Sequence, residues 1–532
     1  MATLATLVIP AITPIQRADM SEQIRDTAAQ NERNLPIPTH PDNGDETLYH
    51  TKVGNYSKGL PHNSHGEVDL NAYQSMLTAM NSGNVTDFEN IVLGGAVPLV
   101  DPQAGLAYDL EGTDSHQLSM PPAPALISDV KAAEAVELYW MALMRDIPFD
   151  RYAFSELAEE AAMELSSLPA FSRLLSGVHQ PVTAANLFRG FTDGDLKGPY
   201  ISQFLYQTLE FGAAEIVQRF QTLLPLRDGG TDWMTDFPSW LDCQNGAGTL
   251  AAAWKTPSAA PNRIDPVRRY IRRGRDICQY VHVDVLFEAY FNACLYLIHN
   301  NAPLNPGNPY ITSKTQTGFG TFGSPHIKTI IAEVSTRALK AVWFQKWFVH
   351  RHLRPEAYGG LVHNALTGYQ QEETLPSSIL NSKAVERCFF RNGTYLMPHA
   401  FPEGCPQHPS YGQGHGTVAG ACTTVIKAFF DETWQIPNPV VPSEDGLSLL
   451  NYTGPDTLMV GGEVDKLAAN IALGRNHAAV HWRSDYAQAV LLGEQVAISV
   501  LKDQLKTFNE LPRIQTTGWS FTGFGGNTVT LV

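Results

Sequence analysis

Apolar side chains recur at three- and four-residue spacing through most of the chain after Ser128. This period places apolar side chains on one face of an α-helix. It runs through residues 130–146, 150–168, 331–353 and 464–505. Strict alternation of β-branched residues, which is typical of half-buried strands, is scarce. The pattern therefore predicts a mostly α fold in which the helices pack as bundles.

The first 125 residues differ from the rest, because Pro, Gly, Asn and Asp are frequent there and periodic stretches are few. We expect residues 1–125 to wrap the body as loops and short helices. The remaining chain divides into a first bundle half at 126–340, a second bundle at 341–510 and a tail at 511–532. The polar linker at 299–320 has a length that is typical of functional or oligomer-forming loops.

The chain is acidic and has enough apolar residues to be globular. Its 532 residues allow one very large domain or several ordinary ones, and 43% apolar residues suffice for a substantial core. Acidic residues outnumber basic ones by 53 to 37, which gives a formal net charge of -16. This balance excludes a nucleic-acid scaffold, which needs a broad basic face. No run reaches the roughly 18 apolar residues of a membrane helix, so we expect no membrane span.

Signals for export and for zinc are weak. The run MATLATLVIPAITPIQ at the N-terminus has no basic stretch before its apolar part, which argues against a secretory signal and leaves the localisation unknown. The cysteines have no CxxC spacing and so indicate no zinc site. We expect buried free thiols, with a Cys388–Cys405 disulfide as the open alternative. The six cysteines are Cys243, Cys278, Cys294, Cys388, Cys405 and Cys422.

Three basic segments interrupt the last third of this acidic chain. They read KWFVHRHLRPE from Lys346, HPSYGQGHG from His408 and GRNHAAVHWRSD from Gly474. In the first, a helix through Trp343 and Lys346 should end near Arg354, because Pro355 disfavours the α conformation of the residue before it. Lys346 and Arg354 can then lie near one side of the helix end. A solvated basic face is the alternative.

The second segment places glycine at Gly412, Gly414 and Gly416, just before the helical run TVAGACTTVIKAFF. Glycines let the backbone approach a ligand closely, and their amides at a helix start can form an anion nest. His415 lies inside that nest, where it can donate or accept a proton. The alternative is an ordinary glycine-rich turn with a histidine whose hydrogen bonds are satisfied.

The third segment carries Arg475 and His481, which six positions would place on different sides of one continuous helix. If both face one ligand, the helix must be interrupted between them, and Asn476 is the candidate position. His481 and Asp485 share a face if a helix begins there. Asp485 would then accept from one imidazole nitrogen and leave the other as a ligand. A helical histidine paired with an aspartate for stability alone is the alternative.

Together the segments supply a lysine, two arginines, a glycine nest and two histidines, which suits a small, highly charged oxyanion. This ordered set resembles the pocket of the vanadium-dependent haloperoxidases, particularly the algal and cyanobacterial bromoperoxidases. FRGFTDGDLKGPYISQFL, DWMTDFPSWLDCQNG and RRYIRRGRDICQYVHVDVLFEAYFNA also resemble this subgroup. The likeness covers roughly residues 45–505. It implies two packed four-helix-bundle units of the haloperoxidase and acid phosphatase superfamily type, with the pocket at one end of the second bundle.

The resemblance also implies a role for each pocket residue. His481 would bind the vanadium of a vanadate cofactor, and His415 would act as the acid–base histidine. His408 would lie in the second sphere, where chloroperoxidases tend to carry phenylalanine, and Trp343 would lie on the halide side. The vanadate oxygens would be held by Lys346, Arg354, Arg475 and the amide of Gly414.

One position departs from the family pattern. The family usually has a serine, whose hydroxyl donates to a vanadate oxygen, at the place that Gln413 takes here. A carboxamide can also donate, but it is longer and needs more room. Either Gln413 bends toward the anion and replaces the hydroxyl, or it points away and a backbone amide or water takes that role.

The implied activity is oxidation of bromide, iodide and in some cases chloride by hydrogen peroxide, in which Lys346 also takes part. The product is a hypohalous acid equivalent that halogenates a small organic acceptor. An acid phosphatase or phosphotransferase with His481 as nucleophile is the main alternative, and a non-enzymatic oligomeric scaffold is another. The resemblance implies a homo-oligomer, either a dimer or an assembly of dimers. Some relatives carry structural calcium, for which this sequence suggests no position.

Overall fold

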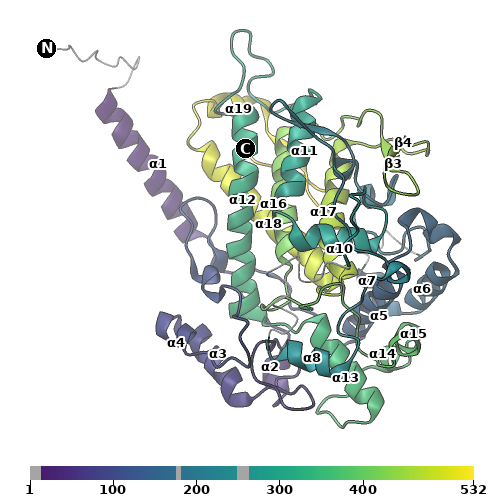
Figure 1. Cartoon of the computed structure of the whole chain (residues 1–532). Helices are drawn as coiled ribbons and strands as arrows, with labels where there is room; N and C mark the ends of the chain where they lie inside the picture. The colour runs from purple at the N-terminus through teal and green to yellow at the C-terminus, as the bar shows by residue number, and fades with distance from the viewer. Residues whose placement is uncertain (1–12, 175–180, 248–262) are drawn as a thin grey trace.

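The computed structural model describes residues 13–174, 181–247 and 263–532, and within them the chain is mostly α (Figure 1). The expected fold class is confirmed. The N-terminal region contains α1 (Pro14–Asn34), α2 (Asp45–Leu48), α3 (Leu70–Ser82), α4 (Val85–Glu89), η1 (Pro102–Leu106) and η2 (Ser115–Gln117). The middle contains α5 (Asp129–Met144), η3 (Phe149–Phe154), α6 (Glu156–Ser166), α7 (Pro169–Leu174), η4 (Asp193–Leu196), η5 (Gln203–Leu205), η6 (Leu226–Asp228) and α8 (Phe237–Gln244).

The second half continues with α10 (Gly274–Val283), α11 (Glu288–His299), α12 (Ser324–Phe344), the π-helical turn η9 (Gln345–His350), α13 (Pro355–Thr367), α14 (Ser377–Leu380) and α15 (Lys383–Asn392). It ends with α16 (Gly414–Phe429), α17 (Val460–His477), α18 (Arg483–Leu505) and α19 (Leu511–Thr517). Three antiparallel hairpins pair β1 (Leu209–Phe211) with β2 (Ala214–Ile216), β3 (Val440–Pro442) with β4 (Leu449–Asn451), and β5 (Ser520–Thr522) with β6 (Thr528–Thr530).

The larger hydrophobic core surrounds α16, which packs against α12, α17 and α18 (Figure 1). Two glycines bring α16 and α18 into backbone contact. A Cβ on Gly420 would lie 2.0 Å from the Val490 carbonyl oxygen, and one on Gly493 would lie 1.9 Å from that of Thr417. No side chain larger than glycine fits at either position. The two helices therefore cross at these glycines, each of which lies in the N-terminal half of its helix. This crossing brings the first turns of α16 and α18 together.

A second core joins α5, α6 and α7 to α13, α14 and α15. Its link to the pocket is direct, because α13 begins immediately after Arg354. On the other side of this segment, the chain near residue 55 pairs with it. The amide of Tyr56 donates to the Arg351 carbonyl at 2.8 Å, and Asn55 forms a β-bridge with His352. The N-terminal region therefore supports the strand-like stretch that leads to Arg354.

The N-terminal region differs from the expected loops and short helices, because α1 is 21 residues long. Thr13 and Gln16 form a capping box at its start, and Pro14 occupies the first helical turn. None of its residues is buried, and Figure 1 shows it leaning away from the body. Its polar composition has no amphipathic period, so the apolar pattern gave no signal for it.

The remaining expectations concern loops, thiols and membranes. The described part of the linker at 299–320 forms no helix or strand beyond the end of α11 at His299. All six cysteines are buried free thiols, so the alternative Cys388–Cys405 disulfide is wrong.

Among the described residues no single helix is long and apolar enough to span a bilayer, although α10 and α11, bent by 97°, meet that criterion together. The candidate signal run falls mostly in residues 1–12, outside the described residues.

Candidate active site at the start of α16 and α18

The first basic segment does not continue its helix to Arg354. α12 ends at Phe344, η9 carries the chain to His350, and Arg351 turns it in the left-handed region with a φ of 36°. Arg354 is extended and caps α13, with Pro355 in the first helical position. The predicted end near Arg354 is therefore wrong by about one turn. Pro355 makes Arg354 extended, as expected. Arg354, however, caps the start of α13 instead of ending the helix before it.

Lys346 and Arg354 nevertheless reach the same place, and both are buried. Lys346 Nζ donates to the carbonyl oxygens of Pro409 and Ser410, each at 2.8 Å. Arg354 Nε donates to the carbonyl oxygen of His408 at 2.8 Å, and its Nη2 donates to His408 Nδ1 at 2.9 Å. Both cations therefore bind the second segment and fix its position.

Trp343 and His408 pack together beside these cations. Their ring centroids are 4.7 Å apart, and Lys346 Nζ lies 5.7 Å from the Trp343 ring. The Trp343 indole donates to the Val100 carbonyl at 3.1 Å. A Cβ on Gly414 would lie 3.3 Å from this indole. The indole therefore forms a wall over the start of α16.

The second segment presents unpaired backbone donors at a helix start. α16 begins at Gly414, and no side chain caps it. The first amides of a helix have no partner within it and carry the positive end of its dipole. His415 follows in the same turn, and its Nε2 lies 3.1 Å from Asp284 Oδ1 at the end of α10. The nest and its histidine are therefore positioned by α16 and α10 together.

Gln413 points toward α17. Its Nε2 donates to the Ala472 carbonyl at 2.7 Å, and its backbone amide donates to the Asp485 carbonyl at 3.3 Å. The side chain is fully buried, and Oε1 has no hydrogen-bond partner. Of the two alternatives for this position, the geometry agrees with the one in which the carboxamide nitrogen points away from the anion.

The third segment contains the interruption that its spacing demands. α17 ends at His477, Ala479 is left-handed with a φ of 64°, and α18 begins at Arg483. The break therefore lies just after the expected Asn476. It places His481 before α18, where its Nδ1 lies 2.7 Å from Asp485 Oδ2.

Asp485 and Arg354 fix the tautomer of His481. Arg354 Nη1 can only donate, and it lies 2.9 Å from His481 Nε2, so Nε2 must carry the lone pair. Nδ1 then carries the proton and donates it to Asp485. The Ser410 hydroxyl and the Trp482 amide also donate to Asp485 Oδ2. His481 thus presents an unprotonated nitrogen to the pocket.

Arg475 comes from the last turn of α17 and is also buried. Its Nη1 donates to the Val281 carbonyl of α10 at 2.8 Å, and its guanidinium lies 5.2 Å from the Phe401 ring. Its Nε is buried and has no hydrogen-bond partner. One strong donor therefore remains unused beside the other cations.

The pocket holds more positive charge than its own carboxylates compensate. Burial lowers the pKa of Lys346 well below its ordinary value, and the neighbouring Arg354 lowers it further. Burial likewise lowers the pKa of Arg354 and of Arg475. The pKa of His481 is lowered well below its usual range by burial and by Arg354, which keeps the imidazole neutral. Such a set is suited to an anion that supplies the missing negative charge.

Sequence reasoning missed two polar residues of this site. Asp284 faces His415, and Ser410 donates to Asp485. Ser410 lies inside the second segment, so its place in HPSYGQGHG was an available signal. Asp284 lies more than 130 positions from His415 and within no recognisable spacing. Only the packing of α10 against α17 brings it here.

A separate buried cluster has the residue types of a metal site. One ligand atom each from Glu356, His399 and Cys405 lies within 4.8 Å of the others. However, Lys58 Nζ donates to Glu356 Oε2 at 3.0 Å and to the Cys405 carbonyl at 2.6 Å. The lysine already supplies the positive charge there, so we assign no metal to this cluster.

Known proteins resemble the whole chain and not only this pocket. No protein-family model matches it. It is 34% identical to the vanadium-dependent bromoperoxidase of Corallina officinalis, across 94% of this chain and 97% of the relative. The vanadium-dependent bromoperoxidase of Ascophyllum nodosum is 33% identical across 93% of this chain and 90% of the relative. The chain belongs to the vanadium-dependent bromoperoxidases. Membership makes it a haloperoxidase and overturns the acid phosphatase alternative.

The fold agrees with this membership. The solved homohexameric structure of the second vanadate-dependent bromoperoxidase from Ascophyllum nodosum superposes with a TM-score of 0.90 and 28% sequence identity. The superposition covers 100% of this chain and 93% of that one. The likeness therefore extends over the N-terminal region as well as both hydrophobic cores.

Proposed function

We propose that the enzyme holds vanadate among Lys346, Arg354, Arg475 and His481 and uses it to oxidise bromide with hydrogen peroxide. The net reaction is Br⁻ + H₂O₂ + H⁺ → HOBr + H₂O, and the hypobromous acid equivalent then halogenates a small organic acceptor. The observation that carries the proposal is the buried excess of cations beside a neutral, lone-pair-bearing histidine nitrogen.

The residues present fit this oxyanion. The unpartnered Nε of Arg475 and the free amides at the start of α16 are donors without acceptors. Guanidinium groups offer paired, charge-assisted hydrogen bonds to the oxygens of a tetrahedral or trigonal-bipyramidal anion. His481 Nε2 offers the single nitrogen ligand. A divalent cation would be repelled by the same set, because Lys346, Arg354 and Arg475 surround the position.

Each group then has a defined task. Bound vanadate would supply a vanadium(V) centre that activates hydrogen peroxide toward attack by halide, and the vanadium would stay in the +5 oxidation state. Lys346 and Arg354 hold the His408–Ser410 backbone and supply positive charge. Asp485 keeps His481 in the tautomer with an unprotonated Nε2, which accepts from Arg354 Nη1 at 2.9 Å. Asp284 binds His415 Nε2, which leaves His415 Nδ1 to take and return the proton.

The halide and the partners follow from the same arrangement. His408 packs against Trp343 and accepts from Arg354, and we propose that this pair favours bromide and iodide over chloride. The organic acceptor meets a diffusible oxidant and needs no dedicated pocket. We further propose a homo-oligomer built from dimers, which the homohexameric state of the Ascophyllum nodosum neighbour supports.

The decisive experiment is halogenation of a dye with hydrogen peroxide, with and without orthovanadate, in bromide, chloride or iodide. We expect turnover that requires vanadate, is suppressed by phosphate and is fastest with bromide or iodide. The His481→Ala variant should lose at least about a hundredfold in activity and in vanadate retention, because the nitrogen ligand is gone.

His363→Ala is the matched control, since this histidine lies in α13 and contacts Phe237. It should retain full activity. Normal turnover by the His481→Ala variant would overturn the assignment of the ligand. Hydrolysis of a phosphomonoester without any halide oxidation would overturn the proposed reaction itself.

A further inference from the structure

A buried ammonium group and a cysteine sulfur are in direct contact outside the proposed vanadate site. Lys58 Nζ donates to the sulfur of Cys243 at 3.2 Å. The same nitrogen lies 2.9 Å from the carboxylate of Glu356, and it donates to the carbonyl oxygens of Glu403 at 2.8 Å and Cys405 at 2.6 Å. Lys58 therefore binds a sulfur, a carboxylate and two carbonyls at one point, and the proposed reaction uses none of these groups.

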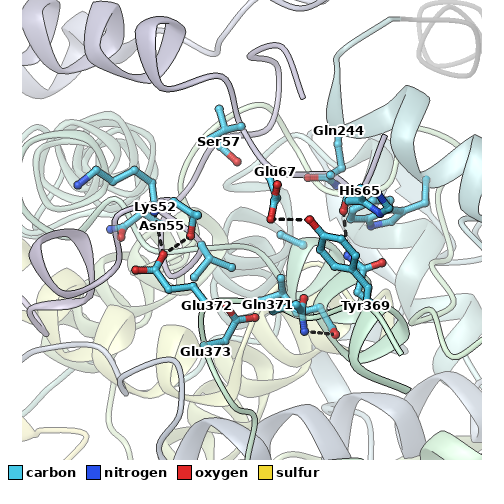
Figure 2. A pocket seen from close by; sticks show the side chains of 18 residues that line it. Lys52, Asn55, Ser57, His65, Glu67, Gln244, Tyr369, Gln371, Glu372 and Glu373 are labelled. Carbon is cyan, nitrogen blue, oxygen red and sulfur yellow. Dashed lines mark hydrogen bonds between the residues drawn. The ribbon is translucent and has the colours of Figure 1, made fainter. Parts of the chain in front are cut away.

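Cys243 differs from the other cysteines in its access to small molecules. It is 9% exposed, whereas each of the other five cysteines is at most 1% exposed. It lies near the end of α8, and the next residue, Gln244, lines a cavity of about 560 Å³ between α8 and α13 (Figure 2). The cavity reaches the surface, because Glu372 in its lining is exposed. A small oxidant can therefore approach this thiol more easily than the other five.

The turn from Phe401 to Cys405 contains both of these carbonyls and borders the oxyanion pocket. The Phe401 ring lies 5.2 Å from the guanidinium of Arg475. Cys405 Sγ donates to the Val480 carbonyl at 3.8 Å, and the same carbonyl accepts from Arg354 Nη1 at 2.7 Å. The lysine that holds this turn is therefore connected to both arginines that we assign to vanadate.

The surroundings of Cys243 determine which oxidant can attack it. Burial raises the pKa of Cys243 and the neighbouring Glu356 raises it further, so the sulfur is present as a thiol. Hydrogen peroxide is attacked by thiolates and reacts only slowly with such a thiol. Hypobromous acid transfers bromine to neutral sulfur, and the proposed reaction produces it in the adjoining pocket. The thiol is therefore sensitive to the product of the enzyme and not to its substrate.

We propose that Lys58 and Cys243 form a modification site, which hypobromous acid converts into a covalent Nζ–Sγ sulfenamide cross-link. This inference rests on the proposed function, because that reaction supplies the oxidant. The net step is Lys–NH₃⁺ + Cys–SH + HOBr → Lys–NH–S–Cys + Br⁻ + H₂O + 2H⁺. Sulfur loses two electrons, and the bromine of hypobromous acid gains them and leaves as bromide.

The contacts around the pair provide for each part of this step. The sulfur lone pair of Cys243 attacks bromine, the Br–O bond breaks, and the thiol proton leaves with the hydroxide as water. Lys58 Nζ gives one proton to the Glu356 carboxylate, 2.9 Å away, and then displaces bromide from the sulfur. A second proton passes from the nitrogen to water. The two atoms that join are already in contact, so a small movement of the flexible lysine stem is sufficient.

The cross-link removes support from the Phe401–Cys405 turn. An ammonium group has three N–H donors, whereas the sulfenamide nitrogen keeps one and carries no charge. It can no longer donate to the carbonyls of both Glu403 and Cys405, and unpaired buried carbonyls are unfavourable. The turn must then shift beside Arg475, and we expect vanadate affinity to fall by about tenfold. The product would thus lower the activity of the enzyme that forms it.

Peptide mass spectrometry under non-reducing conditions tests the cross-link directly. The natural protein is treated with reagent hypobromite, or it turns over hydrogen peroxide and bromide with vanadate bound. We expect a peptide pair that joins Lys58 to Cys243, with a mass two hydrogens below the sum of its parts. Dithiothreitol should separate the pair and restore vanadate affinity, because thiols reduce the S–N bond. Hydrogen peroxide without bromide should give little of it.

Two variants and a matched control assign the cross-link. Cys243→Ser keeps the size of the side chain, should form no cross-link, and should keep its vanadate affinity after hypobromite. Lys58→Arg keeps a positive charge beside Glu356 and should also form no sulfenamide. Cys278→Ser is the control, since Cys278 is a fully buried thiol whose Sγ donates to the Gly474 carbonyl at 3.7 Å. It should cross-link as the natural protein does.

Three outcomes would contradict the proposal. Absence of the Lys58–Cys243 pair after hypobromite, or an equal yield with hydrogen peroxide alone, would overturn the cross-link by hypobromous acid. Unchanged vanadate affinity of the cross-linked protein would overturn its effect on the pocket.

Reagent hypobromite separates this proposal from the proposed function. A cross-link with the reagent, but neither a cross-link nor dye bromination during turnover, would overturn the proposed reaction and leave the modification site standing. Dye bromination during turnover, with no cross-link under either condition, would overturn the modification site and leave the reaction standing.

Discussion

Gln413 is the residue at which this chain departs from its family's usual serine. Its carboxamide nitrogen is bound by the Ala472 carbonyl of α17, so it is not free to donate to an anion. The buried Oε1 is an acceptor beside an anion site and contributes no attraction. Gln413 therefore links α16 to α17 and, unlike serine, supplies no hydrogen-bond donor to the cofactor.

We expect Gln413→Ser to bind vanadate about tenfold more tightly, because a hydroxyl gains a charge-assisted hydrogen bond. It should also melt at a lower temperature, because the bond to Ala472 is lost and a cavity opens. Equilibrium binding of vanadate and thermal unfolding measure the two effects. Gln413→Ala removes the same bulk without adding a hydroxyl. Equal vanadate affinity of the two variants would show that the serine hydroxyl does not reach the anion.

Some of the site's contacts could be predicted from residue spacing and others could not. The four-residue spacing of His481 and Asp485 predicted their contact, although His481 lies just before α18 and Asp485 in its first turn. Pro355 predicted an extended Arg354 for a similarly local reason. The contact of His415 with Asp284 depends on how α10 packs, and no local rule encodes it. Local geometry was predictable and distant partners were not.

At the scale of elements, the pocket depends on the crossing of α16 and α18. Gly420 and Gly493 allow that crossing, since a Cβ at either position would overlap a backbone carbonyl of the other helix. Backbone atoms cannot move aside as the end of a flexible side chain can. The separation of these helices therefore sets the distance between His415 and His481.

We expect Gly493→Ala to lower the free energy of unfolding by about 3 kcal/mol, because its methyl group must push α16 from α18. Vanadate affinity should fall in the same variant, since the two halves of the pocket separate. Gly320→Ala is the control, because a Cβ there meets nothing within 4 Å. Denaturant unfolding and vanadate binding provide the measurements. A Gly493→Ala variant as stable as Gly320→Ala would show that the helices can shift freely.

At the scale of the whole molecule, α1 is the element without an explanation in the single chain. It has 21 residues, none of them buried, and its sequence is polar on all sides. Helices in proteins gain most of their stability from packing. The homohexameric neighbour covers all of this chain, and contact with a second copy would give α1 the packing that it lacks here.

We expect a chain that lacks residues 1–30 to form a smaller oligomer with unchanged vanadate affinity per site. Assembly of the full chain should strengthen with salt, because each copy carries a formal charge of -16 and screening reduces their repulsion. Sedimentation velocity measures both effects. An identical oligomer after truncation would place the interface elsewhere on the molecule.

The sequence by itself determined the mostly α fold, because the apolar period is a local property of each helix. It also determined which residue types could hold an oxyanion, and it located the break between Arg475 and His481 to within a few positions. The tertiary structure decided what these residues contact. Asp284 at the pocket and the link from Gln413 to Ala472 both depend on segments that are distant in sequence. Such contacts follow from the packing of distant segments, which produces no repeating pattern in the sequence.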